Sequence, residues 1–309
     1  MFNQLDYFKE TSETLKLARN VKNNFSPLSE GVVFVLSFFA MLLFTGLMTL
    51  LFIRGIPENT DTYILVTQTC FIFSILFTLL IVTKVEKRNL RGMGFSREKV
   101  LSYIVKGFCL GFVMFLIVTV IGTLVGLYKF DYLNFSTWYL AIPYLLTFII
   151  QSFAEEIYTR GWVIPLFSRN HSVIVAIGIS VLLFVVGHAG NIGFNVGSII
   201  NLVLVSVLLA FMLLKFDNIW ICGGVHSAWN FTQGYLLGFN VSGINTSSLF
   251  NFSQTTNNII SGGAFGPESG LIVSFVLLLV IIFVYKIWFS LDHILFNGLN
   301  VCSLGYRLI

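Results

Sequence analysis

The chain has 309 residues, of which 56% are hydrophobic and only 10% charged; its formal net charge is +4 and its mean hydropathy is +0.88. Because soluble domains carry charge on about a quarter of their residues, this composition excludes an ordinary soluble globular protein. The small net charge gives no reason to expect nucleic acid as a partner. We therefore expect an integral membrane protein whose main partner is the lipid bilayer.

The first 30 residues are polar and mixed in charge, and they lack the short apolar core and cleavage site of a signal peptide. They predict a polar cytoplasmic tail over 1–30, followed by a transmembrane helical domain over 31–309. An apolar stretch of about 20 residues can cross a hydrocarbon core of about 30 Å. Such stretches predict an all-α polytopic membrane helix bundle of about eight transmembrane helices, over 31–53, 62–83, 104–128, 138–166, 172–190, 196–214, 218–237 and 271–289.

Basic residues indicate the orientation of these helices. If the N-terminus is cytoplasmic, only Arg54 and Lys129 among the lysines and arginines fall outside. This bias follows the positive-inside rule and places both termini in the cytoplasm, with the segment from Lys84 to Lys99 as the strongest anchor. The connection 238–270 contains no Lys or Arg and would lie outside. The Phe-, Asn- and Ile-rich composition favours a bacterial plasma membrane.

Few ionisable groups lie deep within the predicted spans, and such groups usually mark a functional site. The fourth span holds Glu155, Glu156 and Arg160. Glu156 and Arg160 are four residues apart on one helix face, so they are expected to form an ion pair. Glu155 is turned about 100° from its neighbour and can face another group. The pair is therefore predicted to supply one structural and one reactive carboxylate.

Two further spans each contribute a histidine. His188 lies four residues after Phe184, and His226 lies four residues before Asn230, so each pair shares a helix face. A buried carboxylate can act as general base on water with one histidine assisting, while the other histidine and Asn230 donate hydrogen bonds to an oxyanion. Glu155 and the two histidines could instead bind a catalytic metal such as zinc. The residues leave both mechanisms open.

Three motifs on separate spans resemble the CPBP family of membrane proteases, which includes type II CAAX prenyl endopeptidases and bacteriocin-processing or self-immunity proteins. The motifs are EExxxR at 155–160, FxxxH at 184–188 and HxxxN at 226–230, and they occur in the order typical of that family. The glycine-rich segment 262–270 also resembles bacterial members. The resemblance covers about residues 85–290, and three motifs in order are far more specific than any one alone.

The resemblance implies an intramembrane endopeptidase (metallo- or glutamate-type) that cleaves a membrane-associated peptide or lipidated protein. Its substrate could be a prenylated CAAX tail, a pheromone precursor or a bacteriocin leader. The implied roles are water activation by Glu155 with His188 assisting, oxyanion stabilisation by His226 and Asn230, and support of the site by Glu156, Arg160 and Phe184. The cofactor would be either none or one divalent metal such as zinc held by Glu155, His188 and His226.

Two other classes of function stay open. A non-catalytic membrane scaffold or bacteriocin self-immunity protein would tolerate Glu155→Gln, and a transporter using Glu155 and His188 would show gradient-dependent uptake. The complete set of motif residues favours the enzyme, and the lack of internal repeats disfavours the transporter. From the span limits, His188 lies roughly 8–12 Å from the depth of Glu155 and His226. A tilted or late-starting fifth helix would remove this difference, whereas a straight helix from Ser172 would not.

Overall fold

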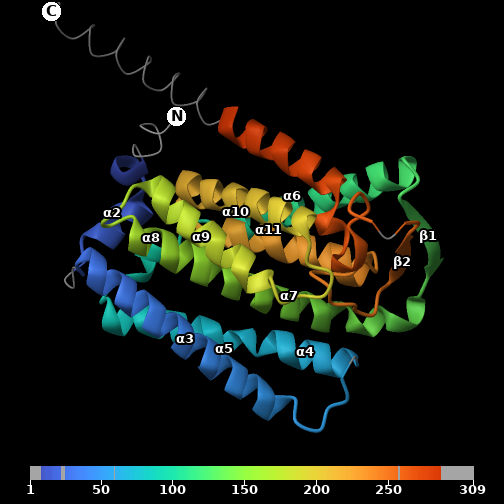
Figure 1. Cartoon of the computed structure of the whole chain (residues 1–309), viewed down its shortest axis with the longest axis horizontal. Coiled ribbons are helices and arrows are strands. Elements are labelled where there is room, and N and C mark those ends of the chain that lie inside the picture. The colour runs from blue at the N-terminus through green and yellow to red at the C-terminus, as the bar shows by residue number, and fades with distance from the viewer. Residues whose placement is uncertain (1–7, 22–24, 59, 257, 287–309) are drawn as a thin grey trace, which may run out of the picture.

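The computed structural model describes residues 8–21, 25–58, 60–256 and 258–286 (Figure 1). Residues 1–7 and 22–24 of the predicted tail and 287–309 of the predicted transmembrane domain lie outside the described residues. So do the end of the predicted span 271–289 and the C-terminus that we expect in the cytoplasm. The described chain is a bundle of apolar helices with a small sheet at one end (Figure 1). The predicted fold class, a polytopic membrane helix bundle, is confirmed.

Five helical runs in the described residues are long and apolar enough to cross a membrane. They are α3 (Pro27–Phe52), the run α4 (Asp61–Thr69), α5 (Phe71–Leu80) and η1 (Ile81–Val85), α6 (Val100–Leu124), the run from η3 (Phe135–Leu140) to α8 (Ile164–Phe167), and α10 (Val196–Phe216). Two apolar helices are shorter: α9 (Val173–His188) and Leu271–Lys286. A 16-residue helix such as α9 rises only about 24 Å. The predicted number of about eight spans is therefore not confirmed.

Polar residues between the apolar runs determine where the helices begin. Ser26 caps α3 and is followed by Pro27, whose missing N–H costs nothing in the first turn. Ser172 accepts a hydrogen bond from the backbone at the start of α9. Asn195 forms a capping box at the start of α10, and Asn218 caps α11 (Ile219–Phe231). These caps let the chain reverse within a few residues between α8 and α9 and between α10 and α11.

Two glycines allow α6 and α11 to meet at backbone distance. A Cβ atom on Gly107 would lie 2.4 Å from the carbonyl oxygen of Ile221, and one on Gly111 would lie 2.2 Å from that of Val225. The glycines are four residues apart, so both lie on the same face of α6, a spacing that favours close helix packing in membranes. This packing fixes the position of α11, the helix that carries His226.

The sheet joins two segments that were predicted only as connections. Strand β1 (Tyr128–Leu133) pairs with β2 (Phe250–Gln254) in an antiparallel register in which Tyr128 opposes Gln254 and Leu133 opposes Phe250. The connection 238–270, which contains β2, also contains two short 3₁₀ turns, η6 (Gly263–Phe265) and η7 (Pro267–Ser269). The sheet closes the end of the bundle opposite α2 (Figure 1).

A short helix within the predicted polar tail packs onto the bundle. In α2 (Glu13–Arg19), the side chains of Leu15 and Ala18 are fully buried. The hydroxyl of Ser12 and the backbone N–H of Thr14 donate to one carboxylate oxygen of Asp217, at 2.5 and 3.0 Å. Asp217 terminates α10, so α2 is attached to the turn that leads into α11.

A buried charge cluster connects the segment after η1 to residues that flank α8. Glu86 accepts hydrogen bonds from Trp162 and Arg169, and its carboxylate lies 3.3 Å from Nε of Arg88. Burial lowers the pKa of Arg88 to about 10, although Glu86 opposes this shift. Arg88 is therefore still charged at neutral pH and needs Glu86 as its counter-ion. The cluster fixes the part of the chain that we predicted to be the main cytoplasmic anchor.

Candidate active site

The two adjacent glutamates of the first motif have different surroundings. Both lie at the C-terminal end of α7 (Ala141–Glu156), immediately before the π-helical turn η4 (Ile157–Val163). The side chain of Glu156 is 0% exposed, whereas that of Glu155 is 18% exposed. The helical period turns the two carboxylates in different directions, so one is enclosed and the other faces accessible space.

Glu156 joins two other motif residues. One of its oxygens accepts hydrogen bonds from Arg160 Nη1 at 3.1 Å and from Nδ1 of His226 at 2.9 Å. The Arg160 guanidinium also lies over the ring of Phe184, 4.3 Å from its centroid. Because Nδ1 of His226 donates to a carboxylate, the other ring nitrogen, Nε2, is directed elsewhere. The expected Glu156–Arg160 ion pair is therefore present, and it orients His226.

Glu155, His188 and His226, from α7, α9 and α11, converge in a three-helix cluster. Glu155 Oε2 lies 3.8 Å from Nε2 of His226 and 4.0 Å from Nε2 of His188. Nδ1 of His188 pairs with the carbonyl oxygen of Phe184 at 2.7 Å, which leaves Nε2 of the neutral ring as an acceptor. Glu155 Oε2 has no hydrogen-bond partner in the described part of the chain. These separations exceed hydrogen-bond length and suit a bridging water molecule.

His188 lies in the cluster although residue counts along the helices predicted a different membrane depth for it. Helix α9 begins at Val173, directly after its cap Ser172, so a late start is not the explanation. Instead, α9 runs obliquely past α7 (Figure 1). Counting residues along each helix therefore misjudged the separation, because it treated the helix axes as parallel.

Asn230 reaches the cluster through a residue that the sequence analysis did not select. Its Nδ2 donates to Gln151 Oε1 at 3.0 Å and to Ser152 Oγ at 3.3 Å. Nε2 of Gln151 in turn donates to Glu155 Oε1 at 2.5 Å. The four-residue spacing between Gln151 and Glu155 was the available signal. Donation from Asn230 to an oxyanion stays a prediction; its contacts in the structure orient Gln151, and through it Glu155.

Residues 137–232 match the family model described as type II CAAX prenyl endopeptidase Rce1-like. The chain carries an Rce1-like segment. The resemblance drawn from the three motifs is confirmed over that segment, which contains every residue of the three-helix cluster together with Gln151 and Asn230. No curated protein and no solved structure matches the chain.

The Rce1-like segment, as placed, does not form a metal site. Among the described residues, no group of three or more His, Cys, Asp or Glu side chains has a suitable arrangement. Tetrahedral zinc ligands at about 2.0–2.1 Å from the metal lie about 3.4 Å from one another. The 3.8 and 4.0 Å separations around Glu155 Oε2 are wider than this.

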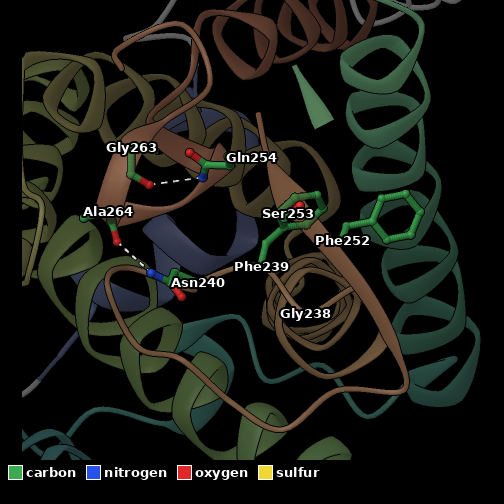
Figure 2. A pocket seen from close by; sticks show the side chains of 8 residues that line it. All are labelled: Gly238, Phe239, Asn240, Phe252, Ser253, Gln254, Gly263 and Ala264. Atoms are coloured by element: carbon green, nitrogen blue, oxygen red, sulfur yellow. Dashed lines mark hydrogen bonds between the residues drawn. The ribbon is translucent and has the colours of Figure 1, made fainter. Parts of the chain in front are cut away.

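A pocket lies beside the loops that follow the Rce1-like segment. It has a volume of about 260 Å³ and is lined by Gly238, Phe239, Asn240, Phe252, Ser253, Gln254, Gly263 and Ala264. The amides of Asn240 and Gln254 donate to the carbonyl oxygens of Ala264 and Gly263, which braces the two sides (Figure 2). No residue of the three-helix cluster lines this pocket. The pocket therefore belongs to the segment 238–264 and not to the candidate active site.

Proposed function

We propose that this protein is an intramembrane endopeptidase that hydrolyses a peptide bond in a membrane-associated, prenylated or precursor peptide. The observation that carries the proposal is the convergence of Glu155 Oε2 with Nε2 of both His188 and His226. The match to a CAAX-type protease family supports it. We further propose that the protein lies in a bacterial plasma membrane with α2 on the cytoplasmic side, as the distribution of basic residues favours.

In the proposed first step, a water molecule donates one hydrogen bond to Glu155 Oε2 and the other to Nε2 of His188. Glu155 removes a proton while the water oxygen attacks the substrate carbonyl carbon. Gln151 holds the other oxygen, Oε1, so the geometry supports Oε2 as the atom that receives the proton. The same proton then passes from Glu155 to the leaving nitrogen as the C–N bond breaks.

In the proposed second role, His226 stabilises the oxyanion of the tetrahedral intermediate. Nε2 must then carry a proton, and the Glu156 carboxylate at Nδ1 stabilises the resulting positive ring. Arg160 balances the charge of Glu156 when the ring is neutral. Asn230 donates a hydrogen bond to Gln151 and so supports the orientation of Glu155.

A non-catalytic scaffold is the alternative that the experiment must distinguish from a peptidase. A carboxylate oxygen that is buried without a partner destabilises a fold, because its desolvation is not offset by a hydrogen bond. Glu155 Oε2 is in this condition among the described residues. Glu156 Oε2 also lacks a partner, but the Glu156 side chain is 0% exposed and that of Glu155 is 18% exposed, so Glu155 is the one that can accept a hydrogen bond from a water molecule. The enzyme is thus the function that the geometry favours.

The test is single-turnover cleavage by the detergent-purified full chain, read by mass spectrometry. The substrates are fluorogenic peptides that include prenylated tails, pheromone precursors and leader peptides, each with and without a strong chelator. We expect cleavage at a defined bond that the chelator leaves unchanged. Loss of cleavage with chelator would contradict the metal-free step, and absence of cleavage across the whole set would favour the scaffold.

Replacement of Gln151 by leucine should lower the cleavage rate about 10- to 100-fold. Leucine removes the hydrogen bond that orients Glu155 and breaks its link to Asn230. Loss of a hydrogen-bond partner that orients a metal-binding side chain typically lowers activity about 10- to 100-fold, and we expect an effect of the same size here. The matched control is Gln68→Leu, which changes a buried glutamine in α4, far from the cluster in the chain. Equal rates for the two variants would show that Gln151 does not position Glu155.

A further inference from the structure

One face of helix α9 packs against the bundle over most of its length. Val173, Ala176 and Ser180 on this face are at most 1% exposed. The hydroxyl of Ser180 donates to the carbonyl oxygen of Thr159 at 2.9 Å. Thr159 follows Glu155 by four residues in the same helical run. The buried face of α9 is therefore turned toward the run that carries the proposed general base.

Gly187 continues this face into the last turn of α9, but the described part of the bundle does not cover it. At 100° per residue, Gly187 lies within about 40° of Val173, Ala176 and Ser180 around the helix axis. It is nevertheless exposed, and a Cβ atom placed on it would have no described atom of another segment within 4 Å. The bundle-facing side of the last turn of α9 therefore borders open space.

This open space lies beside the three-helix cluster. Gly187 immediately precedes His188, and the side chains of Glu155, His188 and His226 are 18, 12 and 11% exposed. Gln151, one turn before Glu155, is also partly exposed. The cluster is thus not sealed on the side where α9 ends, and the residue at position 187 controls how much room is left there.

A peptide that is cut at the cluster needs such room. Its carbonyl carbon must approach the attacking water to about 3–3.5 Å, which brings the residues on both sides of the scissile bond close to His188. A side chain at position 187 would compete with a substrate side chain for the same space. Forcing extra atoms into a filled space is costly, so position 187 can limit the size of the substrate residue.

We propose that Gly187 is a specificity-determining residue of the peptidase site: its missing side chain leaves the space that a bulky substrate side chain next to the scissile bond occupies. This inference rests on the proposed function. It assigns to the site a substrate class, peptides with a large residue beside the bond that is cut, and it gives the last turn of α9 a role in substrate selection besides carrying His188.

The experiment uses the full chain in detergent and a fluorogenic peptide that the wild type cleaves with dependence on Glu155. The peptide residue on each side of the cut bond is varied in turn between Ala, Leu and Phe. Gly187 is replaced by Ala, Leu and Phe, and Gly178 receives the same three substitutions as the matched control. Gly178 is also exposed with open space at its Cβ position, but it lies about 180° around α9 from Gly187.

At one of the two peptide positions, the wild type is expected to cleave the Phe peptide at least as fast as the Ala peptide. There, the Gly187 series should lower the Phe-to-Ala ratio of kcat/KM in steps, to about one tenth of the wild-type ratio or less in Gly187→Phe, mainly through KM. The Gly178 series should leave the ratio unchanged. Both Gly→Ala variants should melt at or above the wild-type temperature, because alanine favours a helix over glycine.

The outcomes separate this inference from the proposed function. Glu155-dependent cleavage with the same ratios in the Gly187 and Gly178 series overturns the role of Gly187 alone. A fall in kcat that is equal for the Phe and Ala peptides would mean that the Gly187 substitutions displace His188, and it also overturns the size limit. If no peptide is cleaved with dependence on Glu155, both proposals are wrong.

Discussion

Replacement of Glu155 by glutamine is expected to lower the single-turnover cleavage rate about 10²- to 10⁴-fold, the contribution typical of a general base. Glutamine has the same size and can keep the contact with Gln151, but it cannot take a proton from water. The measurement is the rate of product formation with enzyme in excess over a fluorogenic peptide. Because the change is nearly isosteric, the melting temperature should stay close to that of the wild type.

A matched substitution tests whether the loss belongs to this glutamate. Glu98 is exposed in the segment before α6, so Glu98→Gln makes the same chemical change away from the three-helix cluster. It should cleave at the wild-type rate. If Glu155→Gln cleaves as fast as Glu98→Gln, then Glu155 does not activate the water, and the mechanism proposed above is wrong.

Replacement of Arg160 by methionine is expected to lower the free energy of unfolding by about 3–5 kcal/mol, the cost typical of breaking a buried ion pair by removing one partner. Both side chains of the Glu156–Arg160 pair are 0% exposed, so Glu156 would be left charged without its cation. Methionine keeps much of the apolar contact with Phe184. Denaturant unfolding in mixed micelles, followed by circular dichroism, measures the difference.

The double variant Glu156→Gln with Arg160→Met should recover part of that loss, since no isolated charge remains. The exposed pair of Arg91 and Glu13 provides the control, with side chains 53% and 63% exposed. Arg91→Met should change stability by less than about 1 kcal/mol. Equal destabilisation by Arg160→Met and Arg91→Met would show that the buried pair does not stabilise the site.

The contacts that depend on helix periodicity were predictable from the sequence. The four-residue spacing of Glu156 and Arg160 predicted their ion pair, and the 100° turn between adjacent residues predicted that Glu155 would face elsewhere. Both predictions depend only on the local geometry of one helix. The convergence of Glu155 with His188 and His226 depends in addition on how three helices pack, and for that the order of the motifs was the informative signal.

Features that depend on distant or uncharged segments were not predictable in the same way. The β1–β2 sheet pairs two segments more than 110 residues apart. Each segment alternates apolar and polar residues, over 128–132 and 250–253, but a short alternating run does not show which distant segment it pairs with. Gln151 carries no charge, so a search for ionisable groups within spans passed over it. The number of spans was uncertain because an apolar pattern does not distinguish a 16-residue helix enclosed by protein from one that crosses the bilayer.

The attachment of α2 to Asp217 has a consequence for the order of assembly during synthesis. The contacts between Ser12 or Thr14 and Asp217 join residues that are 205 and 203 positions apart in the chain. A ribosome delivers the N-terminus first, so α2 is made long before Asp217 exists. Helix α2 packs mainly against residues 90–93 and α8, which are made earlier, so its buried Leu15 and Ala18 need not wait for α10. The attachment to Asp217 is therefore the late step in the docking of α2, and it coincides with the arrival of α11, the last of the three helices that build the cluster.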